Sequence, residues 1–138
     1  MTVHAGLLRL STAGDGDIVD LTPGIEAVVR QSGVDVGVAV VFAPGATVGV
    51  TTMEFEPGAV GDLQALLDGL IPHEAGEGHN ARNADSNGHA HLRAAVIGPS
   101  ESVPVVGGTL GLGTWQQVVL VDFDDRPRER QVSVQILS

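Results

Sequence analysis

Residues 109–124 read TLGLGTWQQVVLVDFD, and residues 127–138 read PRERQVSVQILS. In the second stretch, valine and isoleucine alternate with glutamine and serine from position 131 to position 136. A period of two places alternate side chains on opposite faces of a strand, so this stretch predicts a β-strand with one buried face. Together the two stretches predict that the last thirty residues form β structure, and this prediction decides the fold class.

Other strands are predicted upstream. Residues 3–12, VHAGLLRLST, form one strand that ends at the turn AGDGD. Residues 34–43, VDVGVAVVFA, form a β-branched run suited to a buried strand. An APG turn follows, and ATVGVTTMEF continues extended, so residues 34–55 are predicted to form a hairpin. ESVPVV and the following GG predict a further strand and turn.

Three segments carry helix signals. Residues 21–33, LTPGIEAVVRQSG, predict a short helix capped by Thr22 and stopped by Gly33. Residues 58–70 place apolar side chains on one helical stripe; they are Val60, Leu63, Leu66, Leu67 and Leu70.

A further short helix is predicted over residues 87–97, NGHAHLRAAVI, with Ser86 or Asn87 as its cap. No element can be assigned from residue 72 to residue 86. Strands outnumber helices and their order is not βαβαβ. We therefore expect one α+β domain over residues 1–138, with a mainly antiparallel sheet or sandwich and two or three short helices.

Composition excludes several classes of function. The net charge is −10, from 7 Lys and Arg against 17 Asp and Glu, so the surface is expected to repel nucleic acid. There is no cysteine, so a metal would need His or carboxylate ligands. No apolar run approaches the roughly 20 residues of a membrane span, and no signal peptide is evident. We expect a cytoplasmic protein that binds neither nucleic acid nor membrane.

Residues 73–91, HEAGEGHNARNADSNGHAH, hold four of the five histidines. Three interpretations compete: a metal or phosphate site, a pH-sensitive surface loop, or a polar linker. His79 and His91 could share a metal ion, although their spacing is not diagnostic. His89 lies two residues from His91, and two residues on a helix point to nearly opposite sides, so the two are expected to diverge.

Three other features have two interpretations each. Glu54 ends the strand before the polar segment, where it is either a solubilising charge or a site residue. RPRER, residues 126–130, is either a charged turn between strands or the source of an Arg that binds an anion. GGTLGLG, residues 107–113, predicts a hairpin with close backbone packing rather than a phosphate loop, because no helix follows it. Trp115 is expected to anchor the core.

The motifs VFAPGATVGVTTME and NGHAHLRAAVIGPSESVPVVGGTLGLGTWQQVVLVDFD, with the Arg of the final strand, resemble the YjbQ-like family. This family is also called the secondary thiamine-phosphate synthase family, and the likeness covers nearly the whole chain. The resemblance implies a homotrimer of α+β subunits with a site formed partly across the subunit boundary. It also implies three histidines placed to hold a metal ion, zinc or another divalent ion, or an anion.

Two of these histidines match His79 and His91 here. The resemblance further assigns a ligand-binding role to Asn87 and a catalytic role to three charged residues; these are Glu54, Asp85 and Arg130. The first family histidine is replaced by Gly45. We therefore expect weak or absent metal binding, unless His89 or a carboxylate completes the site. We also expect Gly45 to need a positive φ.

Two functions follow from the resemblance. The first is a YjbQ-like small-molecule enzyme with weak thiamine-phosphate synthase activity, which joins a pyrimidine diphosphate to a thiazole phosphate. In that enzyme Arg130 and the N–H groups that begin the 87–97 helix would face a phosphate. The second is a non-catalytic trimer that binds a small phosphorylated metabolite or another anion and has lost the metal site through Gly45. A purely structural trimer is the third and weaker interpretation.

Overall fold

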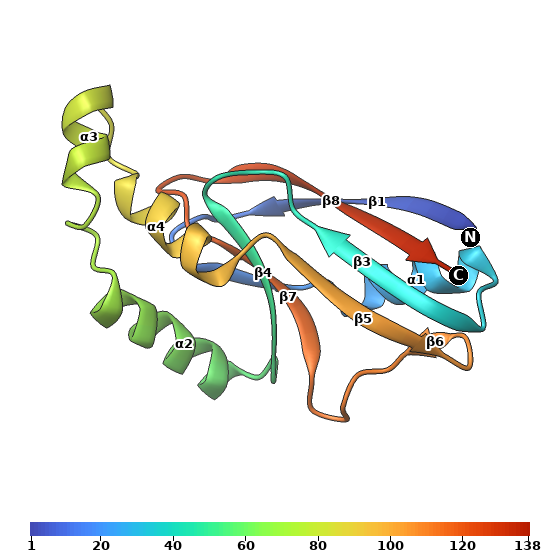
Figure 1. The fold of residues 1–138 in the computed structure, drawn as a ribbon. Helices are drawn as coiled ribbons and strands as arrows, with labels where there is room; N and C mark the ends of the chain where they lie inside the picture. The colour runs from blue at the N-terminus through green and yellow to red at the C-terminus, as the bar shows by residue number, and fades with distance from the viewer.

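The computed structural model describes residues 1–138 as eight strands and four helices (Figure 1). In chain order they are β1 (Val3–Thr12), β2 (Asp17–Asp20), α1 (Thr22–Ser32), β3 (Val36–Phe42), β4 (Val48–Met53), α2 (Pro57–Leu70), α3 (Glu77–Asn83), α4 (Gly88–Ile97), β5 (Ser100–Val106), β6 (Thr109–Leu110), β7 (Gln117–Asp122) and β8 (Arg128–Leu137).

The strands form two sheets. The large sheet has the order β1-β8-β3-β5-β6, and the small sheet has the order β2-β7-β4. Every pairing is antiparallel, which confirms the predicted α+β class with antiparallel sheets. β1 and β8 pair over ten residues, and the two labelled ends of the chain lie close together (Figure 1).

The main core lies between the two sheets and α1. Its residues come from the inward face of the large sheet, from one face of β4 and β7, and from α1. The alternation that predicted β8 is confirmed, since Val132, Val134 and Ile136 are fully buried. The C-terminal β structure was therefore predicted correctly, and it supplies part of the main core.

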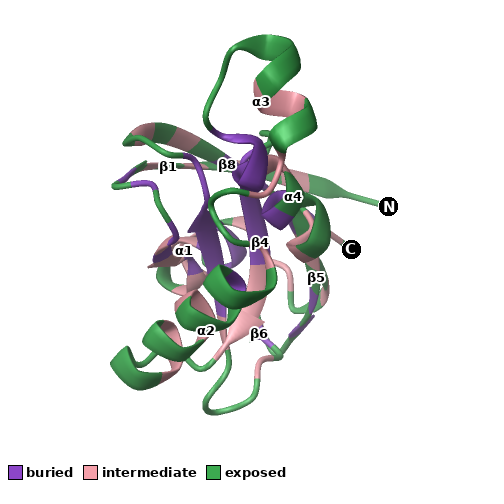
Figure 2. Cartoon of the chain, turned by 90° about the vertical axis from the view of Figure 1, so that its left-hand side faces the viewer, coloured by how far each residue is buried: buried purple, intermediate pink, exposed green.

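The other face of the small sheet packs against α2 and α4. A second cluster contains Val119 and Val121 of β7, Leu67 of α2, and Ala90 and Ala94 of α4. β7 is consequently buried on both faces, and Figure 2 shows the helices lying outside the buried strands. This layer places α4, the helix that carries His91, against β4.

The predicted hairpin over residues 34–55 is wrong. Both strands exist, but β3 pairs with β5 and β8 in the large sheet, whereas β4 pairs with β7 in the small sheet. The APG turn therefore carries the chain from one sheet to the other. β3 and β4 each turn one row of apolar side chains, such as Val41 and Val50, into the core between the sheets. The sequence pattern therefore suits this crossing as well as it suits a hairpin.

The helix predictions need three corrections. There are four helices rather than two or three, because α3 lies within residues 72–86, where no element was assigned. Thr22 does not cap α1: Leu21 is the N-cap residue, and the Thr22 hydroxyl accepts a hydrogen bond from the backbone N–H of Val118 at 3.0 Å. Gly33 does end α1, with φ of 67°. Asn87 is the N-cap residue of α4 but makes no capping hydrogen bond there.

One prediction about burial is also wrong. Trp115 is 73 % exposed and does not anchor the core. In α2, Leu67 is buried, but Leu66 and Leu70 are 55 % and 68 % exposed, so only part of the apolar stripe packs. None of the four helices combines the length and apolar character that crossing a bilayer requires.

Candidate functional site

His79 and His91 meet in the structure. His79 lies on α3 and His91 on α4, and their ring centroids are 4.4 Å apart with the planes tilted by 41°. Asn80 joins the two helices, because its Oδ1 accepts from the N–H of Gly88 at 2.9 Å and lies 3.1 Å from Nδ1 of His79. The polar segment therefore folds so that two distant histidines form a pair.

Close backbone packing makes this approach possible. Gly76, the N-cap residue of α3, has φ of 87°, and a Cβ at this position would lie 2.3 Å from the carbonyl carbon of Gly88. Only glycine combines this φ with this contact at low cost. The sequence between the histidines thus contains the residues that bring α3 against the start of α4.

A pocket of about 290 Å³ adjoins His91, one of the two histidines of the pair. His91 lines this pocket on one side and Gly45 on another, and the remaining lining residues are Ala46, Val48, Ala94, Ala95 and Pro99. Position 45 therefore lies in the same pocket as His91. The expected positive φ at Gly45 is wrong, because Gly45 is not among the glycines with positive φ. Its constraint is crowding, since a Cβ would lie 2.9 Å from Cγ1 of Val48.

Arg130 lies behind Gly45 and is held by Asp122. Its Nε donates to Oδ2 of Asp122 at 2.7 Å, and its Nη2 donates to Oδ1 at 2.9 Å and to Oγ1 of Thr47 at 2.9 Å. The hydrogen bonds to Asp122, together with the charges of Asp122 and Asp124, outweigh burial and raise the pKa of Arg130 above its usual value. Nη1 makes no hydrogen bond and lies 3.1 Å from the position of a Cβ on Gly45. Arg130 is thus part of a buried ion pair and keeps one free donor group toward position 45.

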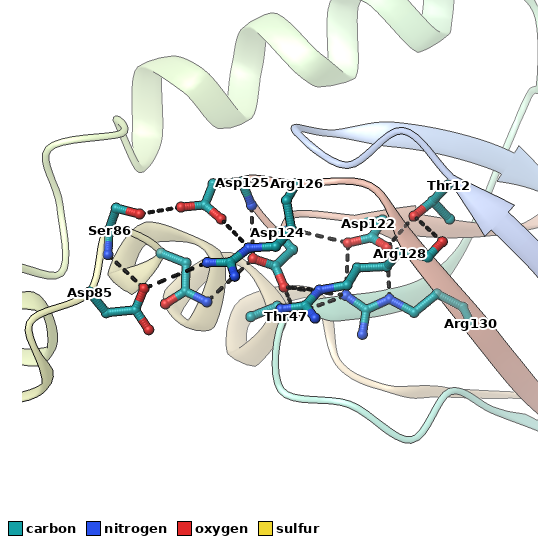
Figure 3. A network of polar contacts seen from close by, with 11 residues as sticks. Thr12, Thr47, Asp85, Ser86, Asp122, Asp124, Asp125, Arg126, Arg128 and Arg130 are labelled. Atoms are coloured by element: carbon teal, nitrogen blue, oxygen red, sulfur yellow. Dashed lines mark hydrogen bonds and ion pairs between the residues drawn. The ribbon is translucent and has the colours of Figure 1, made fainter.

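Asp122 and Asp124 are the centre of a buried polar network between the two sheets (Figure 3). Thr12 of β1 donates its hydroxyl to Asp122 at 2.5 Å, and Nε of Arg128 donates to Asp124 at 2.7 Å. Burial raises the pKa of Asp124, but hydrogen bonds from Arg128, from the N–H of Asp125 and from Asn87 outweigh burial and lower the pKa to about 2. Sequence reasoning missed both carboxylates. In VDFDDRPRER, three aspartates come just before three arginines, and this pattern was the available signal for a network of ion pairs.

Asn87 and Asp85 take part in this network rather than in the pocket. Asn87 is buried, and its Nδ2 donates to Oδ1 of Asp124 at 3.3 Å, while its Oδ1 has no partner. Asp85 accepts from the N–H of Ser86 at 2.8 Å and lies 3.9 Å from Nη2 of Arg126. Both residues fix the loop before α4, so their contacts in this chain position His91 rather than a ligand.

Glu54 is not brought to the histidine pair. It follows the last residue of β4, whereas Gly45 precedes the first, so a six-residue strand of about 20 Å separates them. Glu54 is exposed, and its side chain makes no hydrogen bond or ion pair. The N–H groups that begin α4 were predicted to face a phosphate. The first of them, the N–H of Gly88, instead donates to Oδ1 of Asn80.

The remaining two histidines of the segment form a second cluster with Asp15. His89 diverges from His91, as predicted, and stacks on His73 with ring centroids 4.5 Å apart. Nε2 of His73 lies 2.8 Å from Oδ1 of Asp15, in the turn between β1 and β2. Burial, His73 and Arg93 lower the pKa of His89. The sequence did not predict that Asp15 belongs to this cluster. Asp15 lies 58 residues from His73, and AGDGD indicates a turn without indicating that its Asp15 could be a ligand.

The His79–His91 pair does not by itself provide a zinc site. Structural zinc sites use four protein ligands and catalytic sites use three. No third His, Asp or Glu side chain joins these two histidines at ligand distance, since the only such group of three in the chain is the cluster around His89. Gly45 contributes no donor atom. Within one chain, the residues present therefore supply two ligands, which is too few for zinc.

Known proteins share this architecture of two antiparallel sheets and four short helices. The family profile described as "UPF0047 protein YjbQ-like" matches residues 7–138. The chain is 35 % identical over 136 residues to a UPF0047 protein of Methanothermobacter thermautotrophicus, covering 99 % of this chain and 93 % of that protein. It is 42 % identical over 112 residues to a UPF0047 protein of Mycobacterium tuberculosis, covering 80 % of this chain and 82 % of that protein.

Solved structures show the same fold. A YbjQ-like protein of unknown function from Sulfolobus solfataricus superposes with a TM-score of 0.93 at 32 % identity, covering 99 % of this chain and 98 % of that one. A hypothetical protein from Aeropyrum pernix superposes with a TM-score of 0.90 at 34 % identity, covering 97 % and 98 %. The chain belongs to the YjbQ-like UPF0047 family.

Proposed function

We propose that this protein binds a small phosphorylated metabolite, whose phosphate group lies at the His79–His91 pair. The observation that carries the proposal is the contact between the two imidazoles, 4.4 Å apart, beside the pocket that Gly45 and His91 line. The two histidines come from different helices, and the intervening sequence contains the glycines needed to bring them together. The pocket is small, which suits a metabolite rather than a polymer.

The donors around the pocket favour an anion. Each imidazole can donate a hydrogen bond from a ring N–H, and a protonated ring donates from both nitrogens. Arg130 adds two N–H donors at Nη1, which face the space that a side chain at position 45 would fill. A guanidinium is a natural partner for phosphate. The chain has a net charge of −10 and repels anions as a whole. A local group of hydrogen-bond donors is therefore needed for an anion to bind.

The second candidate is the enzyme activity that the family's other name implies, the joining of a pyrimidine diphosphate and a thiazole phosphate to thiamine phosphate. The observation that favours it is the meeting of the two matched family histidines. In this role the free donors of Arg130 would stabilise the charge of the departing diphosphate. Glu54 and Asp85 would have to contribute from a neighbouring subunit or through a movement of the loop, because neither lines the pocket within one chain.

We also infer that the protein self-associates as a homotrimer. The outward face of the large sheet is apolar on β1 and β3 and at the end of β5; its exposed residues are Val3, Leu7, Val36, Val38, Phe42 and Val106. Apolar patches of this kind mark protein–protein contacts, and β1 also leaves an unpaired sheet edge. A Val38→Glu variant should dissociate the assembly. Light scattering that gives the mass of one chain for the wild type would contradict the inference.

The test of the phosphate site is a calorimetric titration of tag-free protein with inorganic phosphate and with the thiazole phosphate. His79→Ala and His91→Ala should each abolish binding, and the double variant should lose nothing further because the two residues act as one site. His4→Ala, which removes an imidazole from β1, is the matched control and should bind normally. Additive partial losses would show that the two histidines do not share a ligand.

A turnover assay with both thiamine precursors separates the two candidates. Binding without product supports the metabolite-binding protein. Thiamine phosphate formed by the wild type, and not by His91→Ala, would replace that proposal with the enzyme.

A further inference from the structure

A second group of potential ligands lies on the other side of α4, in the cluster of Asp15, His73 and His89. The three residues come from the β1–β2 turn, from the segment after α2 and from the first turn of α4. Each offers one ligand atom, and these atoms all lie within 4.8 Å of one another. None of the three belongs to the phosphate pocket, so this inference is independent of the proposed function.

His89 is the strongest indication that the cluster binds something. The residue is only 2 % exposed, yet neither Nδ1 nor Nε2 has a hydrogen-bond partner. Buried polar atoms are nearly always paired, and leaving one unpaired destabilises the folded state. The buried ring lies against His73, whose Nε2 is beside the Asp15 carboxylate. A ligand that accepts a nitrogen lone pair would satisfy one of these two nitrogens.

Asp15 is held in place by its backbone. It has φ of 55°, and its N–H donates to the carbonyl oxygen of Asp124 at 2.6 Å. The N–H of Gly16 donates to the carbonyl oxygen of Asp122 at 2.8 Å. The turn is therefore fixed on the end of β7, and its carboxylate is presented to His73.

The donor types select the ligand. Two imidazoles and one carboxylate suit zinc and other first-row transition metals, whereas magnesium and calcium prefer oxygen donors. Ligand atoms of a tetrahedral zinc ion lie about 3.3 Å apart. To bind one, the 2.8 Å contact between Nε2 of His73 and Oδ1 of Asp15 would open and the longer distances, all within 4.8 Å, would close. The side chains of Asp15 and His73 are 67 % and 49 % exposed, which leaves a fourth position open to water.

We propose that Asp15, His73 and His89 bind a divalent transition-metal ion, with zinc the ion that the donor set fits best and with water in the fourth position. The site lies where α4, the segment after α2 and the β1–β2 turn meet. The bound ion would join these three segments through their side chains, in addition to the hydrogen bonds that Arg93 of α4 donates to the carbonyl oxygen of Ile71.

Cobalt(II) is the probe that tests the site, because its visible absorption reports coordination by protein ligands. Metal-free, tag-free protein is titrated with cobalt(II), and zinc is then added in competition. The wild type should bind one cobalt ion per chain and release it to zinc. Asp15→Asn and His73→Ala should weaken binding at least about 100-fold, because losing even an outer-shell partner costs 10–100-fold. Both side chains are exposed and Asn tolerates a positive φ, so both variants should fold.

His91→Ala and His4→Ala are the matched controls and should retain wild-type affinity for cobalt. Zinc should also raise the unfolding temperature of the wild type and of both controls, but not of Asp15→Asn or His73→Ala. Absence of saturable cobalt absorption in the wild type would overturn the proposal. Loss of the absorption in His91→Ala with retention in His73→Ala would overturn it too, and would place the metal at the other histidine pair.

Discussion

Replacing Arg130 by methionine should destabilise the protein strongly, because it leaves Asp122 charged and buried. Asp122 is 0 % exposed, and Arg130 provides two of its hydrogen bonds, at 2.7 and 2.9 Å. Thr12 and the N–H of Asp124 provide the others. Methionine keeps most of the apolar stem, so packing changes little and the effect isolates the charge.

The magnitude follows from the burial of this pair. Removing one partner of a buried ion pair costs about 3–5 kcal/mol, and the contacts from Thr12 and Asp124 favour the lower half of that range. Arg130→Lys keeps the charge but loses the two-pronged geometry, so we expect a loss of about 1–2 kcal/mol. Asp122→Asn removes the buried charge. In that background Arg130→Met should cost only about 1 kcal/mol, the value of an ordinary hydrogen bond.

Urea unfolding followed by circular dichroism, at one protein concentration for all variants, measures these differences. The coupling energy between positions 122 and 130 should be at least about 2 kcal/mol. An equal cost of Arg130→Met in both backgrounds would refute the argument, because it would show that Asp122 does not depend on Arg130. A single-variant cost below about 1 kcal/mol would refute it as well.

Three further predictions concern the histidine pair and the polar network. Gly45→His should raise the zinc affinity of the histidine pair at least about tenfold, at the expense of some crowding against Val48; unchanged zinc affinity in a folded variant would show that position 45 does not reach the pair. Asp124→Asn removes a carboxylate with a pKa of about 2 in place of 3.8, so it should cost about 2 kcal/mol above about pH 4 and progressively less as the pH falls toward about 2. Unfolding in urea at several pH values measures this gap, and a gap that does not change with pH would contradict it. Gly76→Ala should separate α3 from α4 and abolish phosphate binding, whereas Gly78→Ala, where a Cβ meets nothing within 4 Å, should bind normally in the same calorimetric assay.

Much of the fold could be predicted because local patterns coincide with the final environment. β8 alternates because one of its faces is buried, and α1 ends at a glycine with positive φ, so period and composition identify both. The hairpin error has a different origin. Residues on β3 and β4 bury the same kind of side chain whether the strands pair with each other or lie in facing sheets, so the pattern does not determine the pairing.

The candidate site was predicted in part. The resemblance picked out His79 and His91, and the structure brings them together. Arg130 was assigned to a ligand, but two of its five N–H donors are used by Asp122 and a third by Thr47. The sequence does not show that Asp122 is fully buried opposite it. The cluster around His89 could not be foreseen, since its three members are distant in sequence and meet only through the packing of α4 against β4 and the β1–β2 turn.

The position of β8 has a consequence for folding during synthesis. β8 lies between β1 and β3, and β1 has no other partner in its sheet. β1 must therefore remain unpaired until residues 128–137 have been made, more than a hundred residues later. At the usual rate of about 5–20 residues per second, this wait lasts several seconds. During that time the apolar residues of β1 and β3 are open to chaperones or to another nascent chain, and a ribosome that stalls before codon 128 would release a chain whose large sheet cannot close.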